Sequence, residues 1–243
     1  MIHSASWPIP KPNESPAGRE TVSVVIPAWN EAARLAATLQ ALHEDERWWD
    51  EIVVVDDGSG DLTFEEARNR ATTVVRHTNN QGKGKAMETG WHLSTGSIVL
   101  FLDADLGASA AYAARLLEPL RSGEADMAIA SFGSAVKPGG FGLVKGLARS
   151  GIYRLSGLRT TAPLSGQRAV RREVLERIGR LSGRFGVEVG LTIDAVRAGY
   201  QVREVPIPFR HHETGRNLRG FVHRGKQFLS VGRALAHRWR NRP

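Results

Sequence analysis

The sequence predicts an α/β protein built on a mostly parallel central sheet with helices on both faces. Two observations support this: short β-branched segments alternate with segments of helical spacing, and three of the strand-like segments end in sequences that carry carboxylates. Alternating strands and helices are typical of parallel sheets. Such sheets bind ligands at the carboxyl ends of their strands. The length of 243 residues suits one domain of this kind.

The first half of the chain holds most of the predicted elements. Val22–Ile26 is a β-branched run that Pro27 ends, and the leucines of Asn30–Leu42 recur at helical spacing. The other predicted strands are Glu51–Val55, Thr73–His77, Ser97–Leu102 and Asp126–Ser131. The other predicted helices are Thr63–Ala71, Gly84–Leu93 and Ala108–Leu120.

The flanking regions have a different character. Residues 1–20 are rich in proline and predict a flexible tail. Residues 135–165 form a basic segment that we expect to be irregular, Val202–Phe209 is strand-like, and residues 218–240 predict a basic amphipathic helix.

The charge is distributed unevenly along the chain. The net charge is +8, but residues 1–134 hold 11 Lys/Arg and 19 Asp/Glu, whereas residues 135–243 hold 22 and 6. The absence of cysteine excludes disulfides and thiolate chemistry. The N-terminus has no signal-peptide pattern, and no stretch is apolar enough to span a bilayer.

Asp103 and Asp105 directly follow the predicted strand Ser97–Leu102. Two carboxylates at positions i and i+2 beyond a strand end can flank one Mg²⁺ or Mn²⁺, because these hard cations prefer oxygen ligands. A solvated turn with a capping aspartate is the alternative for this motif by itself.

Asp57 lies in a second strand-end sequence, Asp56-Asp57-Gly58-Ser59. Asp-Gly is strong turn chemistry, so an ordinary turn is one interpretation. The other is a carboxylate that accepts hydrogen bonds from a ribose or a base.

The glycine-rich segment Asn80–Lys85 precedes a predicted helix. Its glycines let the backbone approach a ligand, and Lys83 offers a charge to a phosphate near a helix N-terminus. The segment is not a P-loop, because His77 stands where that motif needs glycine, and Met87 replaces the third glycine of a dinucleotide-binding motif.

Segment 210–216 follows the strand-like Val202–Phe209 and contains His211, His212 and Arg216. A histidine here could complete a metal shell, and Arg216 could bind a diphosphate. A polar loop without a ligand is the alternative.

Read in order, these motifs resemble the family 2 glycosyltransferases of GT-A fold, the nucleotide-diphospho-sugar transferase fold. The resemblance covers roughly residues 21–215 and rests on Val22–Glu31, Ile52–Ser59, Gly82-Lys83-Gly84 and Leu102–Asp105. Within the family the chain looks most like the dolichyl-phosphate mannose synthase and polyprenyl-phosphate branch. It shares the Gly-Lys-Gly loop and the late histidine with glucosyl-3-phosphoglycerate synthases.

The resemblance implies roles for the matching positions. The nucleotide-sugar site would consist of Pro27, Ala28, Trp29, Glu31, Asp57, Lys83, Asp103, Ala104 and Asp105. The Mg²⁺ or Mn²⁺ ion would be held by Asp105, Asp103 and His211, with His212 as the alternative histidine. The acceptor and diphosphate side would consist of Ser165, Gly166, Gln167, Arg168 and Arg216. The catalytic residues would be Glu188, Asp105 and Arg216.

The resemblance also implies an organisation and a reaction. Residues 21–217 would form the catalytic domain, with a donor half at 21–134 and an acceptor half at 135–217, and 218–243 would be the basic C-terminal helix. The enzyme would transfer a hexose from a UDP- or GDP-linked sugar to an anionic acceptor. We expect a polyprenyl phosphate such as dolichyl or undecaprenyl phosphate, and a soluble phosphorylated acceptor such as 3-phosphoglycerate is the alternative.

The expected location is the cytoplasm, with peripheral contact at the inner face of the membrane through the C-terminal helix; a helix packed on the sheet with a solvated basic face is the alternative. The high pI by itself suggests a nucleic-acid-binding protein, but that function would not explain three strand ends that carry carboxylates. A binding module without catalysis is disfavoured by the intact Asp103-Ala104-Asp105 motif. The sequence leaves the oligomeric state open, a dimer included.

Overall fold

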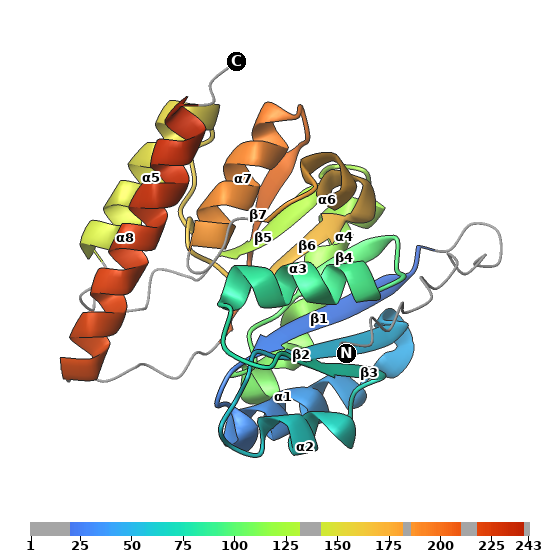
Figure 1. Cartoon of the computed structure of the whole chain (residues 1–243). Helices are drawn as coiled ribbons and strands as arrows, with labels where there is room; N and C mark the ends of the chain where they lie inside the picture. Colours follow the sequence, from blue (N-terminus) through green and yellow to red (C-terminus); the bar gives the residue numbers. More distant parts are fainter. Residues whose placement is uncertain (1–19, 132–141, 182–185, 210–217, 241–243) are drawn as a thin grey trace, which may run out of the picture.

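A seven-stranded sheet crosses the structure in the order β3-β2-β1-β4-β6-β5-β7 (Figure 1). The computed structural model describes residues 20–131, 142–181, 186–209 and 218–240. The strands are β1 (Val22–Ala28), β2 (Glu51–Asp56), β3 (Thr73–Arg76), β4 (Ile98–Phe101), β5 (Met127–Ser131), β6 (Arg168–Arg171) and β7 (Val202–Pro206). The predicted fold class, an α/β GT-A fold with a mostly parallel sheet, is confirmed.

Helical segments connect the strands. They are α1 (Ala32–His43), η1 (Glu46–Trp48), α2 (Thr63–Arg68), α3 (Lys83–Leu93), η2 (Gly107–Leu117), α4 (Glu118–Arg121), α5 (Gly142–Ser156), α6 (Arg172–Ile178), α7 (Val187–Arg197) and α8 (Leu218–Arg240). The segment expected as a helix over Ala108–Leu120 is largely a 3-10 helix. The basic segment that we expected to be irregular contains α5, so that expectation was wrong over its helical part.

The strand order reverses between β1 and β4. From β1 the chain passes through α1 to β2 on one side, and β4 pairs with β1 on the other side. The carboxyl ends of β1 and β4 therefore border the crevice in which parallel sheets bind ligands.

β6 is the one described strand that runs against its neighbours: it is antiparallel to both β4 and β5. In the β4–β6 register Phe101 pairs with Arg168. The start of β6 therefore lies beside the end of β4, which brings the segment 165–167 to the edge that carries Asp103.

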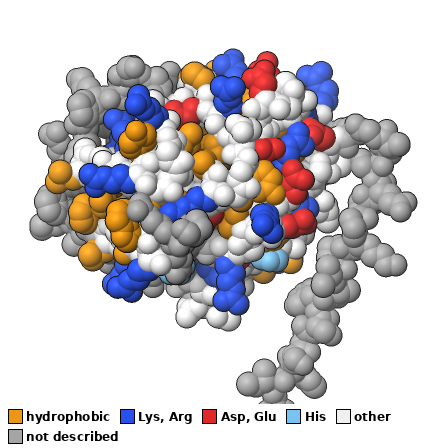
Figure 2. Space-filling model, turned by 90° about the horizontal axis from the view of Figure 1, so that it is seen from above, with side chains coloured by type: hydrophobic (Ala, Val, Ile, Leu, Met, Phe, Trp, Pro, Cys, Tyr) orange, Lys and Arg blue, Asp and Glu red, His pale blue; other side chains and the backbone are white. Residues whose placement is uncertain are grey.

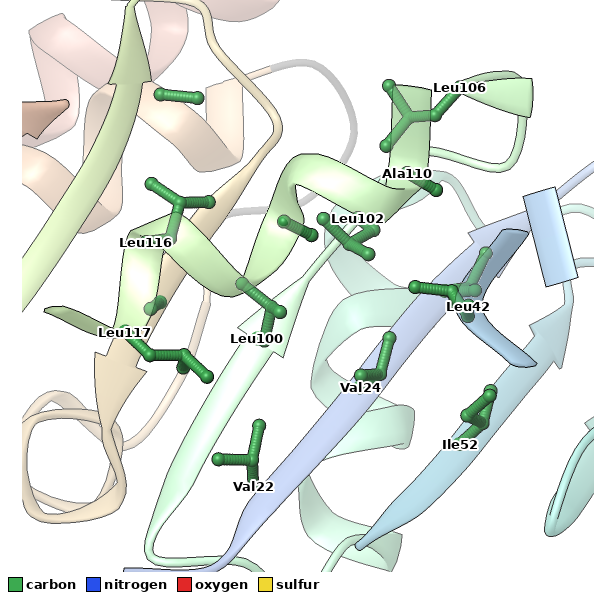
Figure 3. Packing of buried hydrophobic residues seen from close by; sticks show 14 of the residues in the cluster. Val22, Val24, Leu42, Ile52, Leu100, Leu102, Leu106, Ala110, Leu116 and Leu117 are labelled. Carbon is green, nitrogen blue, oxygen red and sulfur yellow. The ribbon is translucent and has the colours of Figure 1, made fainter. Parts of the chain in front are cut away.

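Two apolar clusters cover the two faces of the sheet. Val22, Val24 and Ile26 of β1 face α1 and η2, and Figure 3 shows part of this packing around Leu100 and Leu116. Val25 belongs to the opposite cluster with α3, α6 and α7. Because both faces are buried, the central strands are continuous apolar runs without polar alternation.

A third cluster joins α7 to α5 and α8, and these last two helices stand beside the sheet (Figure 1). Its members include Val144, Ile152, Val189 and Val231. No helix among the described residues is long and apolar enough to cross a membrane.

Candidate active site

Asp103 lies just beyond β4, where side chains from two other segments meet its carboxylate. Its Oδ1 is 2.6 Å from Nζ of Lys83, the first residue of α3. Its Oδ2 accepts a 2.6 Å hydrogen bond from Nε2 of Gln167. Nζ of Lys83 is also 2.9 Å from Oε1 of Glu188, in the first turn of α7. These four residues form what we call the Lys83 cluster.

Lys83 carries a positive charge held between two carboxylates. Burial by itself would lower the pKa of the Lys83 ammonium, but the charges of Asp103 and Glu188 and their hydrogen bonds outweigh it and raise the pKa. The lysine therefore stays protonated through the neutral pH range. It can meet an anionic group of a ligand without first gaining a proton.

Gly166 leaves room for this ion pair. A Cβ atom at position 166 would lie 2.5 Å from Nζ of Lys83 and 2.6 Å from Oδ1 of Asp103. Both distances are shorter than real contacts of a Cβ atom, so any side chain here would displace the pair. The backbone at position 166 is thus a wall of the site.

Arg168 is completely buried beneath this site. Its guanidinium donates hydrogen bonds to the carbonyl oxygens of Ser165 (2.5 Å) and Glu188 (3.1 Å) and to Oγ1 of Thr192 (3.3 Å). Desolvation lowers the pKa of Arg168 to about 10, against the opposing charges of Glu188 and Asp103. Arg168 therefore links the segment before β6 to the first turn of α7, and its contacts here are with the protein itself.

Asp57 holds the loop that precedes α3. Its Oδ1 accepts hydrogen bonds from the backbone N–H of Gln81 (2.9 Å) and its Oδ2 from that of Gly82 (2.7 Å). Nδ1 of His77 lies 2.7 Å from Oδ1, and Nε2 of the same ring lies 3.0 Å from Oγ1 of Thr89. Because Asp57 is almost fully buried, these contacts shape the loop and thereby place the first residue of α3.

The end of β1 forms a second wall. Trp29 follows the strand with half of its surface exposed. Asn30 has a φ of 55°, which its side chain stabilises by accepting a 2.8 Å hydrogen bond from the backbone N–H of Gly60. The backbone N–H of Asn30 donates to Oγ of Ser59. These contacts tie the ends of β1 and β2 together and leave the Trp29 indole at the surface.

Glu31 and Asp105 are close enough for their charges to interact. Burial raises the pKa of Glu31, the Arg34 guanidinium opposes that effect, and the charge of Asp105 adds to it. Arg34 lies 2.8 Å from the Glu31 carboxylate. The edge between β1 and β4 thus has excess negative charge.

The acidic residues at this edge suit a divalent cation that shares its shell with a nucleotide. Among the residues that the structure describes, no group of three His, Cys, Asp or Glu side chains is arranged to hold a metal ion. A Mg²⁺ ion is commonly bound through one or two carboxylates and completes its shell with substrate phosphates and water. Asp103 and Asp105 fit that arrangement.

The structure brings together part of the expected site. Pro27, Ala28, Trp29 and Glu31 lie at the β1 end, Asp103, Ala104 and Asp105 at the β4 end, and Ser165 to Arg168 at the start of β6, with Lys83 and Glu188 completing the cluster. His211, His212 and Arg216 lie outside the described residues.

Sequence reasoning missed several residues that support the site. His77 and Thr89 hold Asp57, as described above. Glu204 on β7 accepts hydrogen bonds from the backbone N–H and Oγ1 of Thr161 (2.8 and 2.5 Å), from the N–H of Ala162 (3.1 Å) and from Oγ1 of Thr160. Burial would raise the pKa of Glu204, but these hydrogen bonds lower it. The partners lie more than 40 positions apart, so no local signal in the sequence reveals them.

The chain is similar in sequence and in structure to several known proteins. Residues 23–179 match the family described as Glycosyl transferase family 2. A polyprenol monophosphomannose synthase of Mycolicibacterium smegmatis is 33% identical over 218 residues, which cover 79% of this chain and 78% of that protein.

Other similar proteins have names that specify 3-phosphoglycerate and not a polyprenol. The glucosyl-3-phosphoglycerate synthase of Mycobacterium tuberculosis is 32% identical over 216 residues, which cover 79% of this chain but only 65% of that enzyme. A crystal structure of that enzyme with Mn²⁺, UDP and phosphoglyceric acid has a TM-score of 0.76 and 29% identity to this chain; the match covers 90% of this chain and 78% of the other.

Proposed function

The chain belongs to glycosyl transferase family 2, and we propose that it transfers a hexose from a nucleoside-diphosphate sugar to a phosphate-bearing acceptor with the help of a divalent cation. The observation that carries the proposal is the Lys83 cluster at the switch point of the sheet. There a protonated lysine, an amide and two carboxylates converge from four separate segments of the chain.

The donor would bind between the ends of β1 and β4. The exposed Trp29 indole offers a flat apolar surface for a base, with Pro27, Ala28 and Glu31 beside it. Asp57 would act on the nucleotide through the loop that it holds. Lys83 would meet the donor's phosphates, because its ammonium stays positive and stands at the N-terminus of α3.

Asp105 and Asp103 would hold Mg²⁺ or Mn²⁺ together with the diphosphate, and His211 remains the proposed third ligand. The ion would add positive charge where the leaving diphosphate gains negative charge. The relative crystallised with Mn²⁺, UDP and phosphoglyceric acid supports this type of site. Arg216 remains a proposed second counter-charge for the diphosphate.

Glu188 would lie on the acceptor side of the sugar with Ser165, Gly166 and Gln167. A phosphate acceptor is already ionised near neutral pH, so it can attack without a strong general base. A hydroxyl acceptor needs a group to take its proton, and Glu188 is the carboxylate closest to Lys83 besides Asp103. The two acceptor types therefore assign different roles to Glu188.

A polyprenyl phosphate is our first candidate for the acceptor, and the matching polyprenol monophosphomannose synthase supports it. A soluble phosphorylated acid such as 3-phosphoglycerate is the second candidate, because the solved structure of similar fold contains phosphoglyceric acid. Both candidates keep the donor site unchanged and differ in what reaches Glu188.

Nucleotide binding tests the donor site directly. UDP or GDP should raise the melting temperature, and Mn²⁺ should increase that shift. Asp105→Ala should remove the effect of Mn²⁺, whereas Asp45→Ala, at a surface carboxylate paired with Arg47, should keep it. If neither nucleotide stabilises the protein with Mn²⁺, or if Asp105→Ala responds like the unaltered chain, the proposed site is wrong.

Transfer assays then separate the acceptors. The protein is incubated with a labelled nucleotide sugar and Mn²⁺, together with either a short-chain polyprenyl phosphate in detergent or 3-phosphoglycerate. Label in the organic phase indicates the lipid acceptor, and label in a new anionic water-soluble product indicates the soluble one. Glu188→Gln should lower turnover strongly only if the acceptor attacks through a hydroxyl.

A further inference from the structure

Two helices, α5 and α8, stand beside the sheet and pack against each other (Figure 1). Their inner sides are apolar: Ala148 and Ile152 of α5 and Val231 of α8 are almost completely buried. The approach is close, because a Cβ atom at Gly151 would lie 2.4 Å from Cδ2 of Leu235. The inner sides thus account for the packing of both helices on the domain.

The outer sides of the same helices also carry large apolar side chains. Nine such residues are exposed within the described part of the chain, and five of them belong to α5 or α8. Their exposed fractions are 83% for Leu143, 49% for Tyr153, 44% for Phe228, 59% for Leu229 and 55% for Trp239. None of the five belongs to a buried apolar cluster, and Tyr153 also has the Arg159 guanidinium 5.7 Å from the centre of its ring.

The spacing on α8 makes a continuous stripe. Phe228, Gly232, Ala236 and Trp239 follow one another at intervals of four, four and three residues, which places them on one side of the helix. The stripe is therefore narrow and extends over residues 228–239 of α8.

The charge of both helices has a single sign. Neither the sequence of α5 nor that of α8 contains an aspartate or glutamate. Exposed Lys145 and Arg149 on α5 and exposed Arg233 and Arg240 on α8 accompany the apolar residues. Figure 2 shows the resulting mixture of orange and blue side chains on the left side of the molecule, where these helices lie.

We propose that this outer side, which we call the α5–α8 face, docks on the surface of an anionic lipid bilayer. Apolar side chains enter the boundary of the acyl chains while arginine and lysine remain at the level of the headgroups. A second copy of this chain would bring like charges together on the same face. A nucleic acid would attract the charges but would leave Leu143 and Leu229 exposed to water.

The inference deepens the proposed function and rests on it for its biological meaning, since a bilayer is where a polyprenyl phosphate is found. The physical claim is independent, because binding to lipid needs no donor, cation or acceptor. Vesicle binding and nucleotide binding can therefore fail separately.

The test is sedimentation of the full-length protein with vesicles. We expect the protein to sediment with vesicles of phosphatidylcholine and phosphatidylglycerol, and much less of it to sediment with vesicles of phosphatidylcholine alone. High salt should release the bound protein from the anionic vesicles. Arg233→Glu/Arg240→Glu should lower the partition coefficient by at least about twenty-five-fold, because each of the two basic residues near an anionic surface contributes roughly a factor of five. Leu229→Ser should also weaken binding.

Matched controls carry the same changes on other surfaces. Arg121→Glu/Arg177→Glu reverses two arginine charges on α4 and α6 and is the control for the double arginine variant of α8. Leu62→Ser removes a similarly exposed leucine near α2 and is the control for Leu229→Ser. Both should bind vesicles like the unaltered protein. The proposal is overturned by equal recovery with both vesicle types, by no binding to either, or by controls that lose binding equally. It is also overturned if light scattering shows a dimer that Leu229→Ser dissociates.

Discussion

Gly166 is a single position at which the absence of a side chain decides the geometry of the site. Gly166→Ala would place a methyl group against Nζ of Lys83 and both oxygens of Asp103. We expect turnover to fall on the order of a hundredfold, because a displacement of about 1 Å in a catalytic group has such an effect. Steady-state kinetics with the labelled donor measure it.

The control for this prediction is Gly146→Ala, since a Cβ atom there would meet nothing within 4 Å. Alanine is favoured over glycine in a helix by roughly 1 kcal/mol, so this variant should be slightly more stable and equally active. Full activity of Gly166→Ala would contradict the packing described for the site.

Arg168, which is fully buried, and Arg172, which is half-buried, lie at opposite ends of one short segment. The Arg172 guanidinium donates to the carbonyl oxygens of Gly96 (2.6 Å) and Ser94 (2.8 Å), far along the sheet from the site. Both Arg168→Met and Arg172→Met should lower the free energy of unfolding by about 3 kcal/mol or more, because each leaves buried carbonyls without a donor.

Only Arg168→Met should alter kinetics at a temperature where both variants remain folded. Arg168 is a positioning residue: it holds the backbone of Glu188, a member of the Lys83 cluster, and that of Ser165, two residues before Gln167. We expect kcat to fall with little change in the KM of the donor, and Arg168→Lys to restore part of it. Equal kinetic losses in both methionine variants would indicate a purely structural role.

At the scale of the elements, β7 anchors residues 160–162, which precede the segment 165–168 at the start of β6. The Glu204 carboxylate accepts the donors of residues 160–162, and its pKa is lowered below its ordinary value. A lowered pKa means that the contribution to stability is present above the unfolded pKa, about 4.5, and is lost as the pH falls through the folded pKa.

Glu204→Gln should therefore lower the free energy of unfolding near pH 7 by about 1–3 kcal/mol. In this variant the free energy of unfolding should also lose the part of its pH dependence that comes from protonation of Glu204. Denaturant unfolding of both proteins between about pH 7 and about pH 3 measures this difference. The difference in the free energy of unfolding between the unaltered protein and Glu204→Gln should become smaller as the pH falls. A gap that stays constant over the whole range would contradict the ionised carboxylate as the acceptor.

At the scale of the whole molecule, α5, α7 and α8 share an apolar cluster of their own. Gly151→Ala would force the methyl group against Leu235 and separate α5 from α8. We expect faster amide hydrogen exchange in α8 while β1, β2 and β4 keep their protection, because local units can open without global unfolding.

The matched variant is Gly232→Ala on α8, where a Cβ atom would meet nothing within 4 Å. It should leave exchange in α5 and α8 unchanged or slower. If Gly151→Ala accelerated exchange across the central strands as well, the three helices and the sheet would form one cooperative unit.

The sequence by itself determined the elements whose burial is local and strong. Val22–Ile26, Ile52–Val55 and Ile98–Leu102 are apolar enough to be strands in any packing, and the polar residues after them had to lie at one edge because parallel strands end together. For the same reason the sequence alone marks Asp57, Asp103 and Asp105 as candidate site residues, and the family resemblance adds Glu31.

Only the tertiary structure decided how the second half of the chain completes the site. β6 is four residues with an arginine at each end, and α5 contains several glycines, so neither has a strong local preference. The antiparallel pairing of β6 with β4 brings Gln167 to Asp103, and the first turn of α7 brings Glu188 to Lys83. These contacts join residues more than 60 positions apart, where packing rather than local sequence sets the distance.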